Sequence, residues 1–141
     1  MQIVVGAQWG DEGKGKIVDF LSESADYIVR YQGGNNAGHT VIVGPETFKL
    51  HLVPSGICRG KQSILGNGVV INPVALAQEI KQLEARGIEV QGKLWLSSRA
   101  HLILAEHIQR DMAQEEARST KVGTTGKGIG PAYTDKITRK G

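Results

Sequence analysis

The sequence predicts an α/β fold in which a mainly parallel central sheet is flanked by helices, and three observations support this. Apolar runs typical of strands alternate along the chain with segments whose apolar residues recur at helical spacing. A glycine-rich bend joins the first apolar run to the first helical segment. A short turn between two further apolar runs predicts one antiparallel hairpin beside the parallel strands.

The N-terminal half contains most of the predicted strands. Residues 2–5 form a short apolar run and residues 26–32 a second one, rich in β-branched and aromatic side chains. Between these two strands, residues 15–24 are predicted to form a helix with an apolar face made of Ile17, Val18, Phe20 and Leu21. The hairpin is expected from strands at 40–43 and 48–53 around the turn 44–47.

The clearest helix follows a predicted strand at 63–71. Asn72 is suited to cap this helix, Pro73 occupies its first position, and Gly87 marks its end. Its buried stripe is predicted to consist of Leu76, Ile80 and Leu83. A strand is predicted at 93–98 and a helix at 102–117. No further element is predicted after Lys121, because the apolar residues there lose their periodicity.

The composition indicates one globular domain, residues 1–141, with no internal boundary. Hydrophobic residues make up 40% and charged residues 22% of the chain, and no apolar run approaches the ~20 residues of a membrane-spanning helix. The net charge of +3 comes from dispersed lysines and arginines, which argues against a nucleic-acid-binding face. With no secretory signal visible, the single cysteine, Cys58, favours a cytoplasmic protein in which this thiol is structural.

The first of three glycine-rich loops, residues 10–16, is predicted to bind phosphate. Backbone amides and the dipole at the start of a helix receive phosphate oxygens well. The spacing matches the G-x-x-x-x-G-K loop of P-loop NTPases and favours a P-loop-NTPase-like fold, although Ile17 stands where a Ser or Thr would bind Mg²⁺. Asp11 is therefore the candidate metal ligand or proton acceptor, and Lys14 the candidate cation for a transferred phosphate. The alternative is a tight turn with solvated charges.

The second and third loops add further candidate groups. Residues 33–40 ("GGNNAGHT") offer the side-chain amides of Asn35 and Asn36 and a histidine, His39, that can act as a general acid near neutral pH. Residues 123–131 offer two threonine hydroxyls on a glycine frame, suited to a second phosphate, although a mobile surface loop is an equal alternative. The other histidines are interpreted as structural: His51, His101 and His107.

Taken by themselves, these residues predict a nucleotide- or phosphate-binding protein equipped for phosphoryl transfer, with the substrate left open. A GTP-binding switch would share the spacing of the first loop, but the missing hydroxyl at Ile17 counts against it. A basic module that binds nucleic acid is supported only by the net charge.

Three long motifs in the same order resemble the adenylosuccinate synthetases, the GTP-dependent ligases of purine synthesis. They are "QWGDEGKGK", "RYQGGNNAGHT" and "GTTGKGIGPAYTDK", with "HLVPSGI" and "GNGVVINP" between them. Members of that family are far longer, so the resemblance implies that this chain is the N-terminal part of a larger single-domain fold. It also implies ligation of IMP and L-aspartate to adenylosuccinate, GDP and phosphate through 6-phosphoryl-IMP, with Mg²⁺ as cofactor.

The resemblance assigns roles by motif match. Asp11 would be the base that removes the N1 proton of IMP, His39 the acid, and Lys14 the third catalytic residue. Mg²⁺ would be held by Asp11 and the backbone carbonyl of Gly38. The implied GTP-binding residues are Gly10, Asp11, Glu12, Gly13, Lys14, Gly15, Lys16, Gly38, His39 and Thr40. The implied IMP-binding residues are Asp11, Glu12, Gly13, Lys14, Asn36, Ala37, Gly38, His39, Thr125 and Arg139.

Two further expectations follow from the resemblance. The family is homodimeric, and Arg139 matches an arginine that reaches the IMP site of the partner subunit. The segments that would select guanine and hold L-aspartate are not among these residues, so an inactive fragment of the ligase is the remaining alternative.

Overall fold

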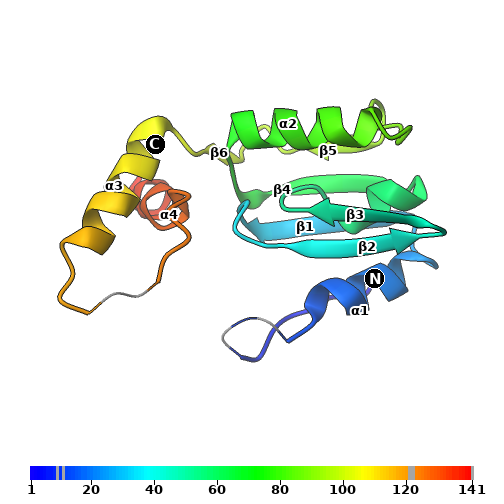
Figure 1. Cartoon of the computed structure of the whole chain (residues 1–141), viewed down its shortest axis with the longest axis horizontal. Helices are drawn as coiled ribbons and strands as arrows, with labels where there is room; N and C mark the ends of the chain where they lie inside the picture. The colour runs from blue at the N-terminus through cyan, green and yellow to red at the C-terminus, as the bar shows by residue number, and fades with distance from the viewer. Residues whose placement is uncertain (9, 11, 121–122, 141) are drawn as a thin grey trace.

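The computed structural model describes residues 1–8, 10, 12–120 and 123–140 (Figure 1). Figure 1 shows α2 along one side of the strands, α1 on the opposite side, and α3 with α4 as a pair at one end. The elements in chain order are α1 (Lys14–Ser22), β1 (Tyr27–Gly33), β2 (His39–Val43), β3 (Glu46–Leu50), the 3₁₀ turn η1 (Ser55–Arg59), β4 (Gln62–Ile71), α2 (Pro73–Glu84), β5 (Leu94–Leu96), β6 (His101–Leu102), α3 (Ala105–Glu116) and α4 (Ile129–Thr138).

The main sheet is parallel and is built around β4. Strand β1 pairs along one side of β4 and β5 along the other, while β6 pairs with the last residues of β4. The register of β1 against β4 shifts between Arg30 and Gln32, where Gly68 allows close approach: a Cβ at residue 68 would collide with the Tyr31 carbonyl. The predicted α/β class with parallel strands is confirmed.

The antiparallel hairpin is also confirmed, but its second strand is displaced. Strands β2 and β3 pair from His39 with Leu50 to Val43 with Glu46, so the turn is shorter than the predicted 44–47. Gly44 enters this turn with φ 57°, a conformation that favours glycine. Residues 51–53, which the sequence placed in the strand, leave β3 and take their backbone hydrogen bonds from side chains instead.

The core lies between β4, α2, the hairpin and η1. Its fully buried side chains include Leu50, Leu52, Ile57, Leu65 and Val69. Cys58 is buried in the same core, and this burial raises the pKa of its thiol to about 11, as suits a structural cysteine.

Helix α2 forms as its sequence predicts. The Asn72 side chain accepts a hydrogen bond from the amide of Ala75 at 3.0 Å and caps the helix, with Pro73 at the first position. Leu76 and Leu83 are buried and Ile80 packs partly buried against the same cluster, so the predicted stripe is confirmed.

The prediction of a strand at residues 2–5, directly before the phosphate loop, is wrong, because these residues do not form a strand. Ile3 and Val5 are 66% and 69% exposed. A strand is stabilised by its sheet neighbours, and this segment lacks a ladder partner within the described residues. The P-loop-like unit is therefore represented by its loop and helix alone.

Helix α1 forms, but its apolar residues are not on one buried face. Ile17 and Phe20 are 52% and 70% exposed, whereas Val18 and Leu21 are half-buried. Tyr27, Val29 and Tyr31 point away from the buried side of β1 and are exposed as well. With Ile17 and Phe20, they leave a large apolar surface area exposed.

The C-terminal part differs most from expectation. Residues 101–102 pair with β4 as β6, so α3 starts later than the predicted residue 102 and ends at Glu116. Helix α4 was not predicted, because its buried residues are Pro131, Ala132 and Asp135 rather than a stripe of large apolar side chains. Within the described residues, no helix combines the length and apolar character that crossing a bilayer requires.

Candidate functional site

The phosphate loop, residues 10–16, enters α1 through glycines in left-handed conformations. Gly10 has φ 120°, and Gly13, the N-cap of α1, has φ 84°. Side chains other than glycine rarely adopt these angles, which explains the glycines at these two positions. The amides of Lys16 and Ile17 both donate to the carbonyl of Gly13, at 3.0 and 3.3 Å. The loop therefore presents a helix N-terminus, the end that favours anions.

Lys14 is already paired within this loop. Its ammonium forms an ion pair with the carboxylate of Glu12, which also accepts a hydrogen bond from the amide of Gln8 at 3.1 Å. The bond from Lys14 is the main cause that lowers the pKa of Glu12 to about 2, so the carboxylate is ionised at neutral pH. A phosphate that binds Lys14 must therefore share the ammonium with Glu12 or replace Glu12 as its partner. Gly6 makes room for the pair, because a Cβ there would lie 2.6 Å from the Lys14 Nζ.

The His39 ring lies directly against the phosphate loop. A Cβ added to Gly15 would fall far inside contact distance of the His39 Nδ1, so any other residue at position 15 would have to displace the His39 ring. Burial is the main cause that lowers the pKa of His39, and the positive charges of Arg30, His51 and Lys14 lower it further. The imidazole is thus neutral at neutral pH and can act there as a hydrogen-bond donor to a developing negative charge.

The start of the loop at residues 33–40 is joined to α4 and, through Tyr133, to β4. The Tyr133 hydroxyl accepts a hydrogen bond from the Gly33 amide at 2.7 Å and donates to the Gly68 carbonyl. Gly34 is covered by Ile129, whose side chain would be 3.0 Å from a Cβ at residue 34. Contacts from α4 therefore fix the start of loop 33–40.

Lys127 links the second and third predicted loops directly. Its Nζ donates to the Asn35 carbonyl at 2.9 Å. Asn35 itself is buried, and its side-chain oxygen has no hydrogen-bond partner within the described part of the chain. Loops 33–40 and 123–131, ninety residues apart in sequence, thus meet in the structure.

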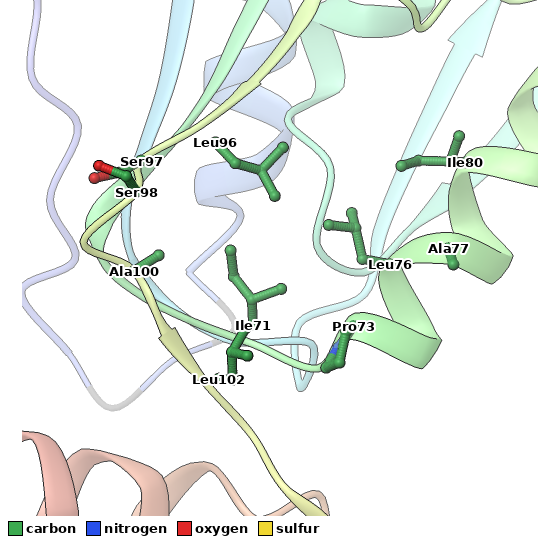
Figure 2. A pocket seen from close by; sticks show the side chains of 10 residues that line it. All are labelled: Ile71, Pro73, Leu76, Ala77, Ile80, Leu96, Ser97, Ser98, Ala100 and Leu102. Atoms are coloured by element: carbon green, nitrogen blue, oxygen red, sulfur yellow. The ribbon is translucent and has the colours of Figure 1, made fainter. Parts of the chain in front are cut away.

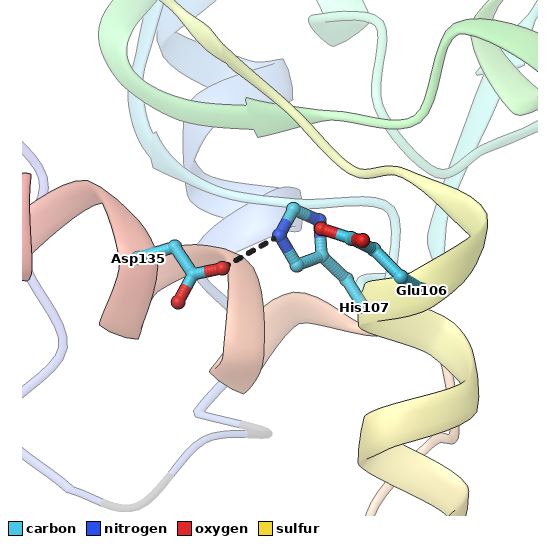
Figure 3. A group of neighbouring side chains, drawn as sticks. All are labelled: Glu106, His107 and Asp135. Carbon is cyan, nitrogen blue, oxygen red and sulfur yellow. Dashed lines mark hydrogen bonds and ion pairs between the residues drawn. The ribbon is translucent and has the colours of Figure 1, made fainter. Parts of the chain in front are cut away.

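Helix α3 holds the start of α4. The carboxylate of Asp111 accepts a hydrogen bond from the Gly128 amide at 2.9 Å, and a Cβ at residue 128 would lie 2.8 Å from the backbone of α3. At the other end, His107 contacts Asp135 of α4 at 3.1 Å (Figure 3). Arg110 contacts the same carboxylate at 3.0 Å. These contacts between α3 and α4 fix the position of loop 123–131.

Glu106, His107 and Asp135 place ligand atoms within 4.8 Å of one another, yet they do not suit a metal (Figure 3). The Leu104 amide donates to Nδ1 of His107 at 2.9 Å, so Nε2 carries the proton and donates to Asp135. Both ring nitrogens are thereby engaged, and Arg110 neutralises the carboxylate. The cluster is a structural link between α3 and α4, consistent with the structural role predicted for His107.

The expected Mg²⁺ site can be tested only at Gly38, because Asp11 lies outside the described residues. Gly38 is exposed, and a Cβ there would meet nothing within 4 Å, so open space surrounds this part of the loop. Its carbonyl is a hard oxygen ligand, and Mg²⁺ commonly uses only one or two protein oxygens beside water and substrate phosphates. The donor set suits Mg²⁺ better than a soft metal.

The structure brings several predicted residues together and leaves one apart. The contact between Gly15 and His39 joins the first two loops, and Lys127 with Asn35 joins the second and third. Thr125 is exposed on loop 123–131. Arg139 is exposed at the far end of α4, about 15 Å along the helix from that loop at 1.5 Å per residue. It does not join the site within this chain.

Sequence reasoning missed several residues that hold the loops in place. They are Arg30, Glu79, Asp111, Lys127 and Tyr133. Lys127 and Tyr133 lie inside a motif that was noted, but the partners of all five are backbone groups, and apart from Gly34, which is near Arg30, these groups are distant in sequence. No local pattern could have indicated the distant pairings.

Two cavities differ in their relation to these loops. The larger, about 400 Å³, is an apolar pocket between α2 and the segment of β5 and β6, and Figure 2 shows its mainly aliphatic lining. None of the predicted site residues lines it. The smaller, about 230 Å³, is polar and lies between α2 and the joined loops, lined by Asn35, His51, Ala75, Gln78, Glu79, Gln82 and Lys127.

A family profile and a curated relative both match this chain to the same protein family. A profile of the adenylosuccinate synthetase family matches residues 3–141. The adenylosuccinate synthetase of Leuconostoc mesenteroides is 61% identical over 140 residues, which is 99% of this chain and 33% of that protein.

Two solved structures share the fold. A fully ligated adenylosuccinate synthetase from Plasmodium falciparum superposes with a TM-score of 0.83 at 43% identity, over 95% of this chain and 32% of that one. A cyanophage S-2L succinoaminodeoxyadenylate synthetase, bound to dGMP and to dATP as an energy donor, gives 0.68 at 28% identity, over 94% and 36%. The chain thus spans about a third of the length of these relatives.

Proposed function

Because this chain belongs to the adenylosuccinate synthetase family, we propose that it forms the phosphate-binding part of an enzyme that joins IMP to L-aspartate. The reaction consumes GTP and yields adenylosuccinate, GDP and phosphate, the first committed step from IMP to AMP. The observation that carries this proposal is the packing of the His39 ring on Gly15, which brings a proton donor to the phosphate loop.

The first half-reaction activates the purine. Asp11, which lies outside the described residues, takes the N1 proton of IMP, and the O6 atom then attacks the γ-phosphorus of GTP. The bond from that phosphorus to the β–γ bridging oxygen breaks, so GDP leaves and 6-phosphoryl-IMP forms. The neutral His39 ring donates a hydrogen bond to the charge that develops on the transferred group, which a preorganised donor stabilises without reorganisation.

The second half-reaction forms the C–N bond. The amine of L-aspartate attacks C6 of the purine, and the O6 atom departs with the phosphate. For this step, the residues of this chain supply the groups that contact the departing phosphate. The residues that hold the two carboxylates of L-aspartate belong to parts of the family fold beyond this chain.

The two substrates are placed on different parts of the joined loops. The phosphates of GTP lie on residues 10–16 and 38–40, and the base of IMP contacts residues 11–14 and 36–39. The 5′-phosphate of IMP lies at Thr125. The link from Lys127 to Asn35 supports this arrangement, because it keeps the IMP-phosphate loop beside the loop that contacts the base.

Mg²⁺ would be held by the Asp11 carboxylate, the Gly38 carbonyl and phosphate oxygens of GTP. When bound, it neutralises phosphate charge as the phosphoryl group is transferred. Lys14, whose ammonium is paired with Glu12 in this structure, contributes a second positive charge to the incoming phosphate.

The exposed apolar surface supports a larger assembly around this chain. Ile17, Phe20, Tyr27, Val29 and Tyr31 are 42–70% exposed, and soluble proteins rarely leave apolar patches of that kind uncovered. We place the remainder of the synthetase fold on this surface. Arg139 then extends from the end of α4 into the IMP site of a second subunit.

The energy donor is GTP in this proposal, although the cyanophage relative is described with dATP in that role. The residues that select guanine are not among the three loops, which contact the phosphates of GTP and the base and 5′-phosphate of IMP. Nucleotide choice is therefore a property to be measured on the complete gene product.

The test is an assay of the complete gene product for adenylosuccinate. Product is expected only when IMP, L-aspartate, Mg²⁺ and GTP are all present, and parallel reactions with ATP in place of GTP measure the nucleotide choice. GTP hydrolysis at the full rate without IMP would instead support the GTP-binding switch. Asp11→Ala should lower turnover by at least the ~10²–10⁴ typical of a lost general base.

A further inference from the structure

The backbone of residues 51–53 is held between two opposite charges. The Arg30 guanidinium of β1 donates to the carbonyls of His51 and Leu52, at 2.6 and 3.1 Å. From the other side, the Glu79 carboxylate of α2 accepts the amides of His51, Leu52 and Val53, at 2.9, 2.9 and 3.2 Å. Each charge is thus satisfied by the backbone of one short segment.

The same two groups are connected to loop 33–40. A second nitrogen of Arg30 donates to the Gly34 carbonyl at 2.6 Å. The His51 Nδ1 lies 2.8 Å from the Ala37 carbonyl and must be the donor there, because a carbonyl can only accept. Loop 33–40 is therefore tied at two carbonyls, one near each end of its turn, to Arg30 and to the segment that Glu79 fixes.

Burial favours this arrangement most strongly at Glu79, which is 6% exposed, whereas Arg30 is half-buried. Burial lowers the pKa of Arg30 while the nearby negative charge of Glu79 raises it. A buried charge is costly unless its hydrogen bonds are satisfied, so the Glu79 carboxylate cannot leave the 51–53 backbone without becoming an unpartnered buried charge, and Arg30 would lose two hydrogen bonds to that segment. The geometry of Gly38 and His39, which follow directly after Ala37, depends on this hold.

We propose that Arg30 and Glu79 are positioning residues that set the conformation of loop 33–40 by clamping residues 51–53 between them. This inference rests on the proposed function for its catalytic consequence, since the loop carries Asn36, Gly38 and His39. Neither side chain contacts substrate in this proposal: Arg30 acts through Gly34, and Glu79 acts through His51 and Ala37.

The variants that test the clamp are Arg30→Lys and Glu79→Gln in the complete gene product. A lysine keeps the charge but concentrates its donors on one nitrogen, and a glutamine replaces one acceptor oxygen by a donor that faces backbone amides. Arg86→Lys and Glu46→Gln are the matched controls. That exposed pair lies at the hairpin turn, where Arg86 also donates to a backbone carbonyl, of Thr47, at 2.8 Å.

Two measurements decide the proposal. Amide hydrogen exchange at residues 34–38, in the absence of ligands, should be at least tenfold faster in both clamp variants and unchanged in the controls. The value of kcat per folded molecule should fall about tenfold or more, as expected for a misplaced catalytic loop. The KM for GTP should rise by a smaller factor than kcat falls, because residues 10–16 are untouched and only the GTP contacts at residues 38–40 are displaced.

The outcomes separate this inference from the proposed function. Unchanged exchange at residues 34–38, or a loss of activity explained entirely by a smaller folded fraction, would overturn the clamp. If the unaltered protein forms no adenylosuccinate, the proposed function fails, while the exchange measurement still decides whether Arg30 and Glu79 hold the loop.

Discussion

The Nδ1 atom of His39 occupies the space that a Cβ on Gly15 would need. This contact joins the first residue of β2 to the first turn of α1, and so joins two loops that the sequence could only propose separately. It requires glycine at residue 15 for a steric reason alone, because its φ is not among the positive values.

Gly15→Ala therefore tests this contact within the phosphate loop to which Gly15 belongs. The added methyl group is expected to displace the His39 ring and to lower kcat of the complete gene product by roughly 10–100-fold, as small misplacements of catalytic groups do. Folding should not suffer, since alanine is the better helix former by about 1 kcal/mol. Steady-state kinetics and thermal unfolding of the same samples measure both effects.

Gly92→Ala is the matched control. Gly92 has φ 74° and open space around its Cα, so the methyl group meets backbone strain but no neighbour. In contrast to Gly15→Ala, Gly92→Ala is expected to lower the free energy of unfolding by roughly 1 kcal/mol and to leave kcat unchanged. A Gly15→Ala enzyme with normal kcat would show that His39 has no catalytic role at this position.

Local signals predicted the elements whose residues interact with near neighbours. Asn72, Pro73 and the stripe that includes Leu76 defined α2, because capping and helical periodicity act within a few residues. The hairpin was predicted from its turn, but β3 was extended too far, since nothing local shows that Arg30 and Glu79 take over the backbone of residues 51–53.

Elements that depend on distant partners were predicted wrongly or not at all. Residues 2–5 have strand-like side chains, yet a strand also needs a neighbour to pair with. Helix α4 is held by polar contacts, such as Asp135 with Arg110, instead of an apolar stripe. The three loops were identified as candidate phosphate sites from sequence, whereas their mutual contacts became evident only from the structure.

Stability at acid pH should depend on Asp135. Hydrogen bonds, first from Arg110 and then from His107, lower its pKa below the ordinary value of 3.8. A carboxyl whose pKa is lower in the folded state contributes stability above the unfolded pKa and loses that contribution as pH falls through the folded value. The difference in free energy of unfolding between the native protein and Asp135→Asn should thus be constant near neutral pH and shrink below about pH 4.

Urea unfolding at pH values from 7 to 3 measures this difference. Glu89→Gln serves as the control, because the Glu89 carboxylate is 70% exposed in its pair with Lys93 and should affect stability little at any pH. A difference for Asp135→Asn that persists unchanged at pH 3 would contradict the assigned ion pair.

The role of Arg139 in a partner subunit can be tested by mixing two defective variants. Asp11→Ala lacks the base, and Arg139→Ala lacks the group that reaches the second subunit. A hybrid dimer has one site free of both changes, so an equal mixture should recover about a quarter of the native activity. Activity no higher than the average of the separate variants would show that Arg139 serves its own subunit or no site at all.

Phosphoryl transfer to the O6 atom of IMP at the joined loops is the central step of the proposed reaction. The most direct measurement uses IMP labelled with ¹⁸O at O6, together with GTP, L-aspartate, Mg²⁺ and the complete gene product. Mass spectrometry should find the label in the inorganic phosphate released with adenylosuccinate, because O6 leaves bonded to the transferred phosphorus. Unlabelled phosphate, formed while adenylosuccinate accumulates, would contradict the proposed chemistry.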